Sequence, residues 1–304
     1  MWGDYRVQPP DAFRIMAVAI LLAAAAGNSW AGKSARQHLQ NAGDKEFHTL
    51  QDSAQKDDPG SEAALGVAYE EGLHVKRDMA EAITWYRRAA EHGNVEVQHH
   101  LAVLYEKGTD IRQDFREAAY WYQKAAALGY APAQCNLGTL YRMGHGVPLD
   151  LNQAAKWYEV AARQGDPQAQ TSLGYMYNHG EGVPHDDRQA VVWYRKAAEQ
   201  GSAIAQKNLG VMYVRGDGVE KDEHEAMRWF EKSAAQGYAP VYINQALLYM
   251  EGIQTRRDFA EARRLLVRAI AEGKDEARPL LRRCEEQLSR EANSPEMVGA
   301  ADRN

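Results

Sequence analysis

Residues 193–201 read WYRKAAEQG, and close variants of these nine letters occur four more times in the chain. The variants WYRRAAEHG, WYQKAAALG, WYEVAARQG and WFEKSAAQG begin at Trp85, Trp121, Trp157 and Trp229. Each of these five tryptophans lies 36 positions from its neighbour in the series. A fixed period between about 20 and 50 residues is typical of a solenoid, in which each unit packs against the next.

Each period encodes two helices, as the unit at residues 133–165 illustrates with the sequence AQCNLGTLYRMGHGVPLDLNQAAKWYEVAARQG. Its apolar and small residues fall into two stripes with helical spacing. Gly144 and Gly146 end the first helix and Gly165 ends the second, because glycine tolerates the positive φ of a helix C-terminus. The first stripe is Ala133, Leu137, Gly138 and Tyr141, and the second is Ala154, Trp157, Tyr158, Ala161 and Ala162. The pattern predicts an all-α solenoid of 36-residue helix-turn-helix repeats.

An aspartate also recurs at the same 36-residue step, and a Glu or Gln follows it three residues later in every repeat. A ladder of metal sites is one interpretation of such periodic carboxylates. The Asp-x-x-Glu/Gln spacing instead predicts a capping box, in which each of the two side chains binds a backbone N–H at the start of the second helix. Loss of such a cap costs about 1 kcal/mol, which is reason enough for the recurrence. The aspartates are Asp78, Asp114, Asp150, Asp186, Asp222 and Asp258.

The repeat frame divides most of the chain into parts. Six repeats occupy residues 59–274, and residues 32–58 form an N-terminal half-repeat cap in which Phe47, Leu50 and Ala54 match the second helix. Residues 275–290 are predicted to form a C-terminal capping helix with a charged outer face. The polar tail at residues 291–304 has nothing to pack against and is expected to be disordered.

The N-terminus differs from everything after it. Residues 15–26 (IMAVAILLAAAA) are continuously apolar, Arg14 precedes them, and Ser29 and Ala31 place small residues at a cleavage site. The run is too short to span a bilayer as a helix. It predicts a signal peptide at residues 1–31 that directs the protein to the bacterial periplasm or the medium and leaves no membrane span after cleavage. A short buried helix is the alternative.

Charge and cysteine content limit the partners and the redox chemistry. The formal net charge is −6, and no long basic run occurs, so nucleic acid is not the expected partner. Mean hydropathy is −0.60, too polar for a multi-span membrane protein. Cys135 and Cys284 are separated by about four repeats, too far for a disulfide, so both are predicted to be free thiols.

The consensus A-x-x-x-L-G-x-x-Y-x-x-G-x-G-V-x-x-D-x-x-x-A-x-x-W-Y-x-K-A-A-x-x-G is met almost letter for letter at residues 133–165, 169–201 and 205–237. This pattern resembles the Sel-like repeat (SLR) family, which is related to the tetratricopeptide repeats. The resemblance implies a right-handed α/α superhelix whose concave wall, built by the first helix of each pair, binds other proteins. It also implies a scaffold or adaptor that regulates an envelope signalling or assembly complex.

Analogy with the tetratricopeptide groove also indicates which residues face the concave wall. They lie two before, two after and five after the leucine that marks each first helix. In the C-terminal half these positions are mainly apolar, and we expect them to receive an extended or helical segment of a partner protein. Burial of the same residues as ordinary core is the alternative. The predicted partner-binding residues are Tyr175, Asn178, Lys207, Val211, Val214, Ile243, Leu247 and Met250.

The sequence predicts no catalytic residue, no cofactor and no metal site. His99 and His100 are adjacent on a helix and point about 100° apart, so they cannot share one ion comfortably. Three loop histidines, His145, His179 and His185, lack a carboxylate or thiolate at ligand spacing. An alternative function remains, a periplasmic cell-wall-active hydrolase or β-lactam-binding enzyme on the same scaffold, because such roles have been assigned to exported SLR relatives.

Overall fold

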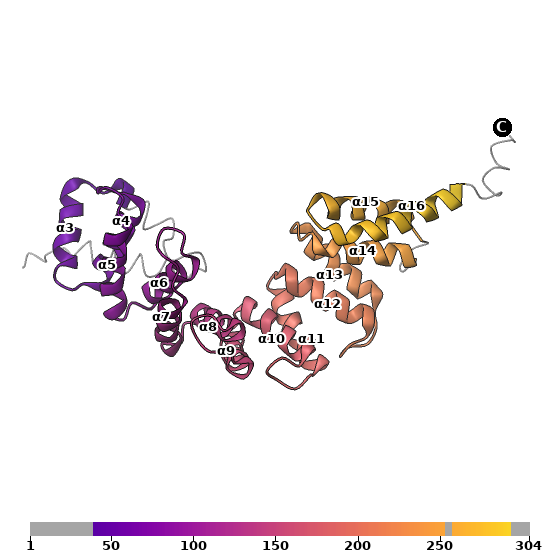
Figure 1. Cartoon of the computed structure of the whole chain (residues 1–304), viewed down its shortest axis with the longest axis horizontal. Helices are drawn as coiled ribbons and strands as arrows, with labels where there is room; N and C mark the ends of the chain where they lie inside the picture. The colour runs from indigo at the N-terminus through magenta and orange to yellow at the C-terminus, as the bar shows by residue number, and fades with distance from the viewer. Residues whose placement is uncertain (1–38, 253–256, 293–304) are drawn as a thin grey trace, which may run out of the picture. The chain divides into compact units, whose positions relative to one another are not determined.

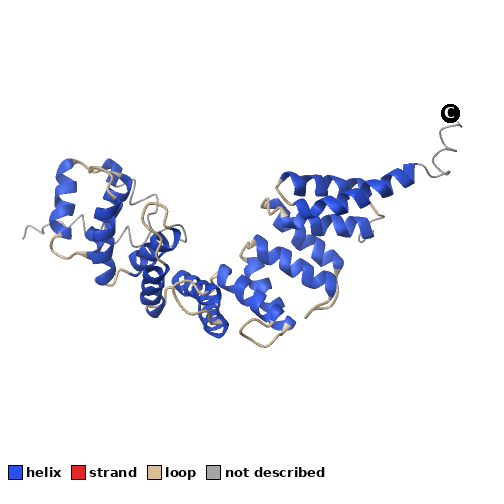
Figure 2. Ribbon diagram, viewed as in Figure 1, coloured by secondary structure: helices blue, strands red, loops and turns tan. Residues whose placement is uncertain are grey.

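A computed structural model describes residues 39–252 and 257–292 of the chain, and these residues form helices and no β-strand (Figure 2). Contacts divide the chain into two compact units, Met1–Trp157 and Tyr158–Asn304. In each unit the helices follow one another as antiparallel pairs, so the predicted all-α solenoid of repeated helix pairs is confirmed. The right-handed superhelical path implied by the family resemblance stays a prediction.

The first unit contains six whole helices and the start of a seventh within its described residues (Figure 1). Packing is closest within a pair, α4 with α5 and α6 with α7, and the second helix of each pair contacts the first helix of the next. The helices are α3 (Asp44–Ala54), α4 (Pro59–Glu71), α5 (Met79–Glu91), α6 (Val95–Lys107), α7 (Phe115–Ala127), α8 (Ala131–Met143) and α9 (Leu151–Arg163), the last of which crosses into the second unit.

The second unit continues the same alternation and ends in a longer helix. In its described residues α10 pairs with α11, α12 with α13 and α14 with α15, and α16 packs on α15. The elements are α10 (Pro167–His179), α11 (Asp187–Glu199), α12 (Ala203–Arg215), α13 (Glu223–Ala235), α14 (Pro240–Glu251), α15 (Phe259–Ala271), the 3-10 helix η1 (Asp275–Ala277) and α16 (Arg278–Ala292).

The periodic aspartates cap the second helices, as predicted. The carboxylate of Asp78 accepts hydrogen bonds from the N–H groups of Ala80 and Glu81 at the start of α5, and Asp222 accepts one from Glu225 at the start of α13. The second half of the predicted capping box is wrong. The backbone N–H of each aspartate donates to the carbonyl of a tyrosine nine residues earlier, as Asp78 does to Tyr69 at 2.9 Å, so no Glu or Gln side chain is needed there. This bond joins the two helices of one repeat.

The glycine after the marker leucine makes room for an aromatic ring of the second helix. A Cβ on Gly66 would lie 2.3 Å from the ring of Tyr86, and a Cβ on Gly210 would lie 2.4 Å from that of Phe230. Real Cβ atoms do not approach this closely, so a side chain at Gly66 or Gly210 would force the ring to shift, whereas the second repeat has Ala102 at this position. These rings are buried at the centre of their repeats. The pairing of a small residue on the first helix with an aromatic ring on the second therefore sets the spacing of the two helices.

A buried glutamine at the start of each middle first helix links one repeat to the next. The side-chain amide of Gln98 donates to the carbonyl of Ala90 at 2.8 Å, and that of Gln206 donates to Ala198 at 3.0 Å. Gln134 and Gln170 form the same bond to the residue eight positions earlier. These side chains are almost fully buried. Each bond is the second one to its acceptor, a carbonyl at the C-terminal end of a second helix that also accepts the N–H of the glycine three residues later.

The described repeats are flanked by α3 at the N-terminal side and by α16 at the C-terminal side. The buried residues of α3 are Phe47, Leu50 and Ala54, the three residues assigned to a second-helix frame. At the other end, Cys284 of α16 is buried and donates to the carbonyl of Phe259. Both cysteines are free, as predicted.

Two predicted segments lie wholly or mostly outside the described residues. The signal peptide at residues 1–31 is one of them. The other is the tail at residues 291–304, of which only the first two residues are described, as the end of α16. Among the helices that are described, none combines the length and the apolar character that crossing a membrane requires.

Candidate functional site

The first helices of the second unit surround a hollow of about 340 Å³, which we call the α12 hollow. α12 supplies half of its lining, α10 and α14 supply residues from the neighbouring first helices, and α11 supplies one tyrosine. The lining is polar at most positions, with amide, hydroxyl and basic groups around two apolar side chains. It consists of Tyr175, Asn178, His179, Tyr194, Lys207, Asn208, Val211, Met212, Arg215 and Asn244.

Half of the residues predicted to bind a partner line this one hollow. They are Tyr175, Asn178, Lys207 and Val211. Val214 and Ile243 do not line the α12 hollow. They are half-buried and pack against the apolar core of the last repeats.

The remaining two predicted residues, Leu247 and Met250, line a second hollow of about 200 Å³, to which α16 contributes Arg283. Met250 is only 7% exposed and belongs to the same apolar core, as the alternative interpretation anticipated. We therefore leave Met250 out of the candidate surface.

One basic group of the α12 hollow, Lys207, is partly desolvated, whereas Arg215 is exposed. Lys207 is half-buried, and this burial lowers the pKa of its ammonium group. The positive charge of Arg215 lowers it further, as the smaller of the two causes. Burial also raises the pKa of the Tyr194 hydroxyl, and a hydrogen bond with Asn208 opposes that rise. The amide of Asn178 donates to Asp187 at 2.7 Å, which fixes its orientation at the edge of the hollow.

Sequence reasoning missed several lining residues because it considered only three positions of each first helix. Asn208 and Asn244 lie one residue before the marker position, where polar residues recur every 36 residues from His100 onward. Arg215 and His179 lie six residues after it. The recurrence of polar residues at the one-before position was the signal that would have found the asparagines.

The same face of the first unit is already occupied by internal hydrogen bonds. The hydroxyl of Tyr86 donates to the carboxylate of Glu70 at 2.5 Å, and Tyr122 donates to Glu106 at the same distance. His100 lies 3.2 Å from Glu70. The acidic residues of this face thus orient the tyrosines of the second helices, and they are less available to a partner than the groups of the α12 hollow.

The histidines singled out from the sequence are engaged separately. His99 packs against Tyr122 and contacts Asn136, and burial, followed by the charge of His100, lowers its pKa to about 4. His100 instead contacts Glu70 and the ring of Tyr86.

The three loop histidines also have partners of their own. The His145 ring packs on Phe115 and the His179 ring stacks on Tyr175. His185 pairs with Asp187.

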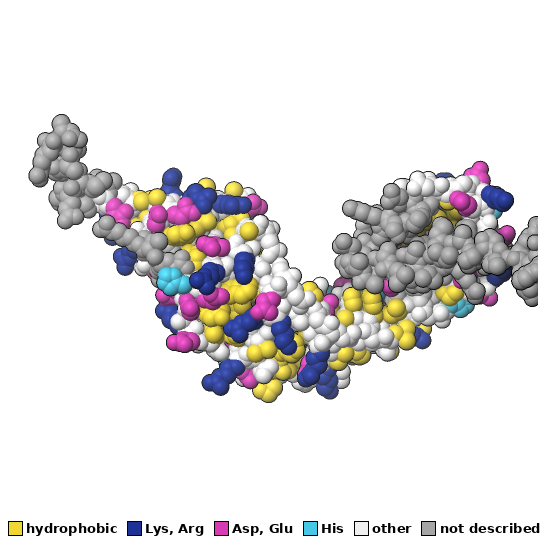
Figure 3. Space-filling view, turned by 180° about the vertical axis from the view of Figure 1, so that it is seen from behind, with side chains coloured by type: hydrophobic (Ala, Val, Ile, Leu, Met, Phe, Trp, Pro, Cys, Tyr) yellow, Lys and Arg dark blue, Asp and Glu magenta, His cyan; other side chains and the backbone are white. Residues whose placement is uncertain are grey.

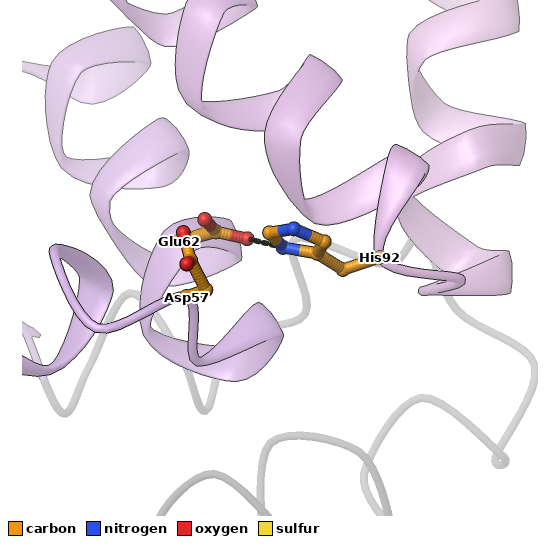
Figure 4. Close-up of side chains that lie close together, drawn as sticks. All are labelled: Asp57, Glu62 and His92. Atoms are coloured by element: carbon orange, nitrogen blue, oxygen red, sulfur yellow. Dashed lines mark hydrogen bonds and ion pairs between the residues drawn. The ribbon is translucent and has the colours of Figure 1, made fainter.

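One cluster in the described part of the chain brings three metal-ligand types together (Figure 4). Donor atoms of Asp57, Glu62 and His92 lie within 4.8 Å of one another, and Nδ1 of His92 is 2.8 Å from the buried carboxylate of Glu62. Arg88 lies in the same place, with its guanidinium 3.0 Å from Glu62 and 2.9 Å from Asp57. Because this guanidinium already pairs with both carboxylates, the cluster is better described as an ion-pair network than as a metal site.

Internal comparison of the repeats explains the cluster. Gln170 and Gln206 occupy the position of Glu62 in later repeats, and their side chains accept hydrogen bonds from Gln200 and Gln236 at 2.8 Å. Those pairs have the same separation of 30 residues as Glu62 and His92. The first repeat thus has an ionisable version of an uncharged pair, and Arg88 donates to Ala54 in place of the glutamine amide.

The surface of the second unit does not carry one large apolar patch on the face drawn in Figure 3. Small groups of hydrophobic side chains alternate there with Lys, Arg, Asp and Glu. Large exposed apolar residues of this unit, such as Val192 and Ile204, are scattered singly. Among the described residues of this unit, we therefore take the α12 hollow, whose lining mixes polar and apolar groups, as the candidate recognition site.

Helix pairs at a strict period, joined by caps and glutamine links, define an α/α repeat solenoid. The Sel1 repeat profile matches residues 59–94, 95–130, 131–166, 167–202, 203–238 and 244–274, and the chain belongs to the Sel1 repeat family. This family is typically a protein-interaction scaffold and is generally non-catalytic. No curated protein matches the chain.

Two solved structures are similar over most of the chain. The antigen c5321 of uropathogenic Escherichia coli, described as displaying an SLR fold, is 35% identical with a TM-score of 0.73; the match covers 83% of this chain and 54% of the antigen. A Sel1 repeat protein from Oxalobacter formigenes is 28% identical with a TM-score of 0.66; the match covers 84% of this chain and 96% of that protein. This chain therefore spans about half the length of the E. coli antigen.

Proposed function

We propose that this protein is a non-catalytic adaptor that holds a segment of a partner protein on the face formed by α10, α12 and α14. The observation that carries the proposal is the α12 hollow, where Tyr175 and Val211 offer apolar contact beside asparagine amides and two basic groups. A peptide presents the same mixture of apolar side chains and backbone hydrogen-bonding groups. The scaffold role typical of the family supports the proposal.

The apolar contact provides a direct test. Val211→Asp places a carboxylate at a half-buried position in the hollow, where a bound segment would have to bury it without a hydrogen-bonding partner. We expect partner capture from bacterial envelope extracts to fall by about tenfold or more, which corresponds to about 1.4 kcal/mol. Val192→Asp is the matched control, because Val192 is on the second helix α11, is 42% exposed and does not line the hollow.

Thermal unfolding of both variants separates binding from folding. Val211 is half-buried and also packs against the apolar core of the last repeats, so we expect Val211→Asp to retain a cooperative transition at a moderately lower temperature while it loses the partner. Retained capture together with a large loss of stability would mean that Val211 belongs to the core, and the proposal would then be wrong.

We further propose that the adaptor acts outside the cytoplasm of a bacterium, in an envelope signalling or assembly complex. Support comes from the apolar run at residues 15–26, the preceding Arg14 and the small residues that end at Ala31. Expression with the natural N-terminus, followed by fractionation and N-terminal sequencing, tests this part. A periplasmic or secreted product that begins near residue 32 is expected, whereas an intact cytoplasmic product would contradict it.

A further inference from the structure

Lys207 and Arg215 place two basic groups at the α12 hollow with no acid to neutralise them. Among the residues that the structure describes, neither side chain forms an ion pair, and no carboxylate lines the hollow. Lys207 is half-buried, and the charge of Arg215 acts on it unfavourably. A half-buried ammonium group next to a second cation is destabilised unless an anion joins them.

The pair has no counterpart in the repeating structure. Lys207 and Arg215 lie two residues before and six residues after the marker leucine of α12. Among the described first helices, α12 is the one with Lys or Arg at both positions, and α6 comes nearest with His99 and Lys107. At the first position the other repeats have Ala63, His99, Cys135, Thr171 and Ile243. At the second position they have Glu71, Lys107, Met143, His179 and Glu251. Residues that build every repeat, such as the buried glutamines, recur, so this pair is not explained by the needs of the fold.

The rest of the lining fits a peptide that passes through the hollow. Asn208 and Asn244 lie at the same position of two successive first helices, and each amide can both donate and accept. Such amides match the N–H and C=O groups of an extended chain. Because α10, α12 and α14 all contribute to the lining, the hollow extends across three helices and suits the middle of a chain.

We propose that the α12 hollow receives an aspartate or glutamate side chain from within an extended partner segment, and that its carboxylate binds between the Lys207 ammonium and the Arg215 guanidinium. This inference rests on the proposed function, since it specifies the partner segment for the same face. Charge-assisted hydrogen bonds to both cations replace the water that Lys207 loses on burial. The asparagine amides then orient the peptide backbone on either side of the acidic residue.

Random peptides displayed between constant flanking residues test the inference, because their selection requires no identified partner. Selection is carried out on the full wild-type protein and on Lys207→Glu, with Lys196→Glu as the matched control. Lys196 undergoes the same charge change but lies over the Trp193 ring on α11, away from the hollow lining. Circular dichroism and thermal unfolding establish that each variant is folded before selection.

We expect Asp and Glu to be enriched in the peptides selected on the wild-type protein and on Lys196→Glu, and Lys and Arg to be enriched on Lys207→Glu. The best acidic peptide should bind Lys207→Met and Arg215→Met about tenfold more weakly than wild type, and its Glu→Gln version should lose a similar factor. Peptides without acidic enrichment, or unaffected by both substitutions, would overturn the inference and leave the proposed function standing. If no peptide that binds this face can be selected, the result would count against both the inference and the proposed function.

Discussion

Replacing Arg88 with alanine should loosen the N-terminal end of the first unit far more than loss of an exposed arginine does. The Arg88 guanidinium lies 3.0 Å from Glu62, 2.9 Å from Asp57 and 3.1 Å from the carbonyl oxygen of Ala54. The Glu62 side chain is fully buried, whereas that of Arg88 is 33% exposed. Arg88→Ala therefore leaves a buried carboxylate that has lost its main counter-charge.

The size of the effect follows from that burial. Removing one partner of a buried ion pair costs about 3–5 kcal/mol, and water that reaches the exposed third of Arg88 offsets part of this. We expect a loss of about 2–3 kcal/mol, which increases local opening of the first repeat by about 30- to 150-fold. Hydrogen exchange of peptides from α3 and α4, followed by mass spectrometry, measures this opening directly. Arg163→Ala is the control, because its ion pair with Glu159 is exposed and is worth about 0.3–0.5 kcal/mol.

A second substitution tests the explanation as well as the size. Later repeats have glutamine at the position of Glu62, and its amide donates to the carbonyl eight residues earlier. In the Arg88→Ala background, Glu62→Gln removes the buried charge and supplies a donor for Ala54, so we expect it to recover at least half of the lost protection. If exchange in α3 and α4 is unchanged by Arg88→Ala, or if the double variant opens more easily than the single one, the reasoning is refuted.

Three further predictions concern packing, pH and capping. Gly66→Ala should destabilise the protein by about 3 kcal/mol, because the new Cβ would overlap the ring of Tyr86. Gly43→Ala is the control and should cost less than about 1 kcal/mol, because its Cβ would meet nothing within 4 Å. Urea unfolding measures both losses, and equal losses would contradict the packing argument. Burial lowers the pKa of His99 from 6.5 to about 4. Between these two pH values the unfolded chain binds a proton at this residue and the folded chain does not, so the free energy of unfolding falls as the pH drops. Between pH 7.5 and 5 this group should remove about 2 kcal/mol from the unfolding free energy, and the difference should vanish in His99→Gln; an unchanged pH dependence in that variant would show that other groups cause it. Asp222→Ala should cost about 1 kcal/mol and increase hydrogen exchange at the start of α13, whereas Asp222→Asn should lose much less, and equal effects would rule out the side-chain cap.

Features set by short-range sequence pattern were predictable. The 36-residue period located the helix pairs, and the recurring aspartates located the N-termini of the second helices. Tyr175, Lys207 and Val211 were assigned to one face because residues at fixed offsets on successive first helices share that face, and the structure places them in one hollow.

Features that depend on the choice between competing partners were not predictable in the same way. The N–H of Asp78 could bond to a side chain three residues later or to the Tyr69 carbonyl, and only the folded loop brings that carbonyl within 2.9 Å. Similarly, the sequence places Glu62 where other repeats have glutamine, but the contact with Arg88 of the next helix becomes evident only in three dimensions. The shape of the α12 hollow also required the structure, because α10, α11, α12 and α14 all contribute to it.

The glutamine links have a consequence for how such a protein can change its length. Each of the four links connects a glutamine side chain to the carbonyl eight residues before it, so each of these junctions is encoded by a short stretch of sequence. A recombination event that adds or removes one whole period therefore creates a junction identical in kind to those already present. Arrays of different sizes can therefore form without a new kind of interface, and only the terminal repeats must differ, as Glu62 and Arg88 show at the first one.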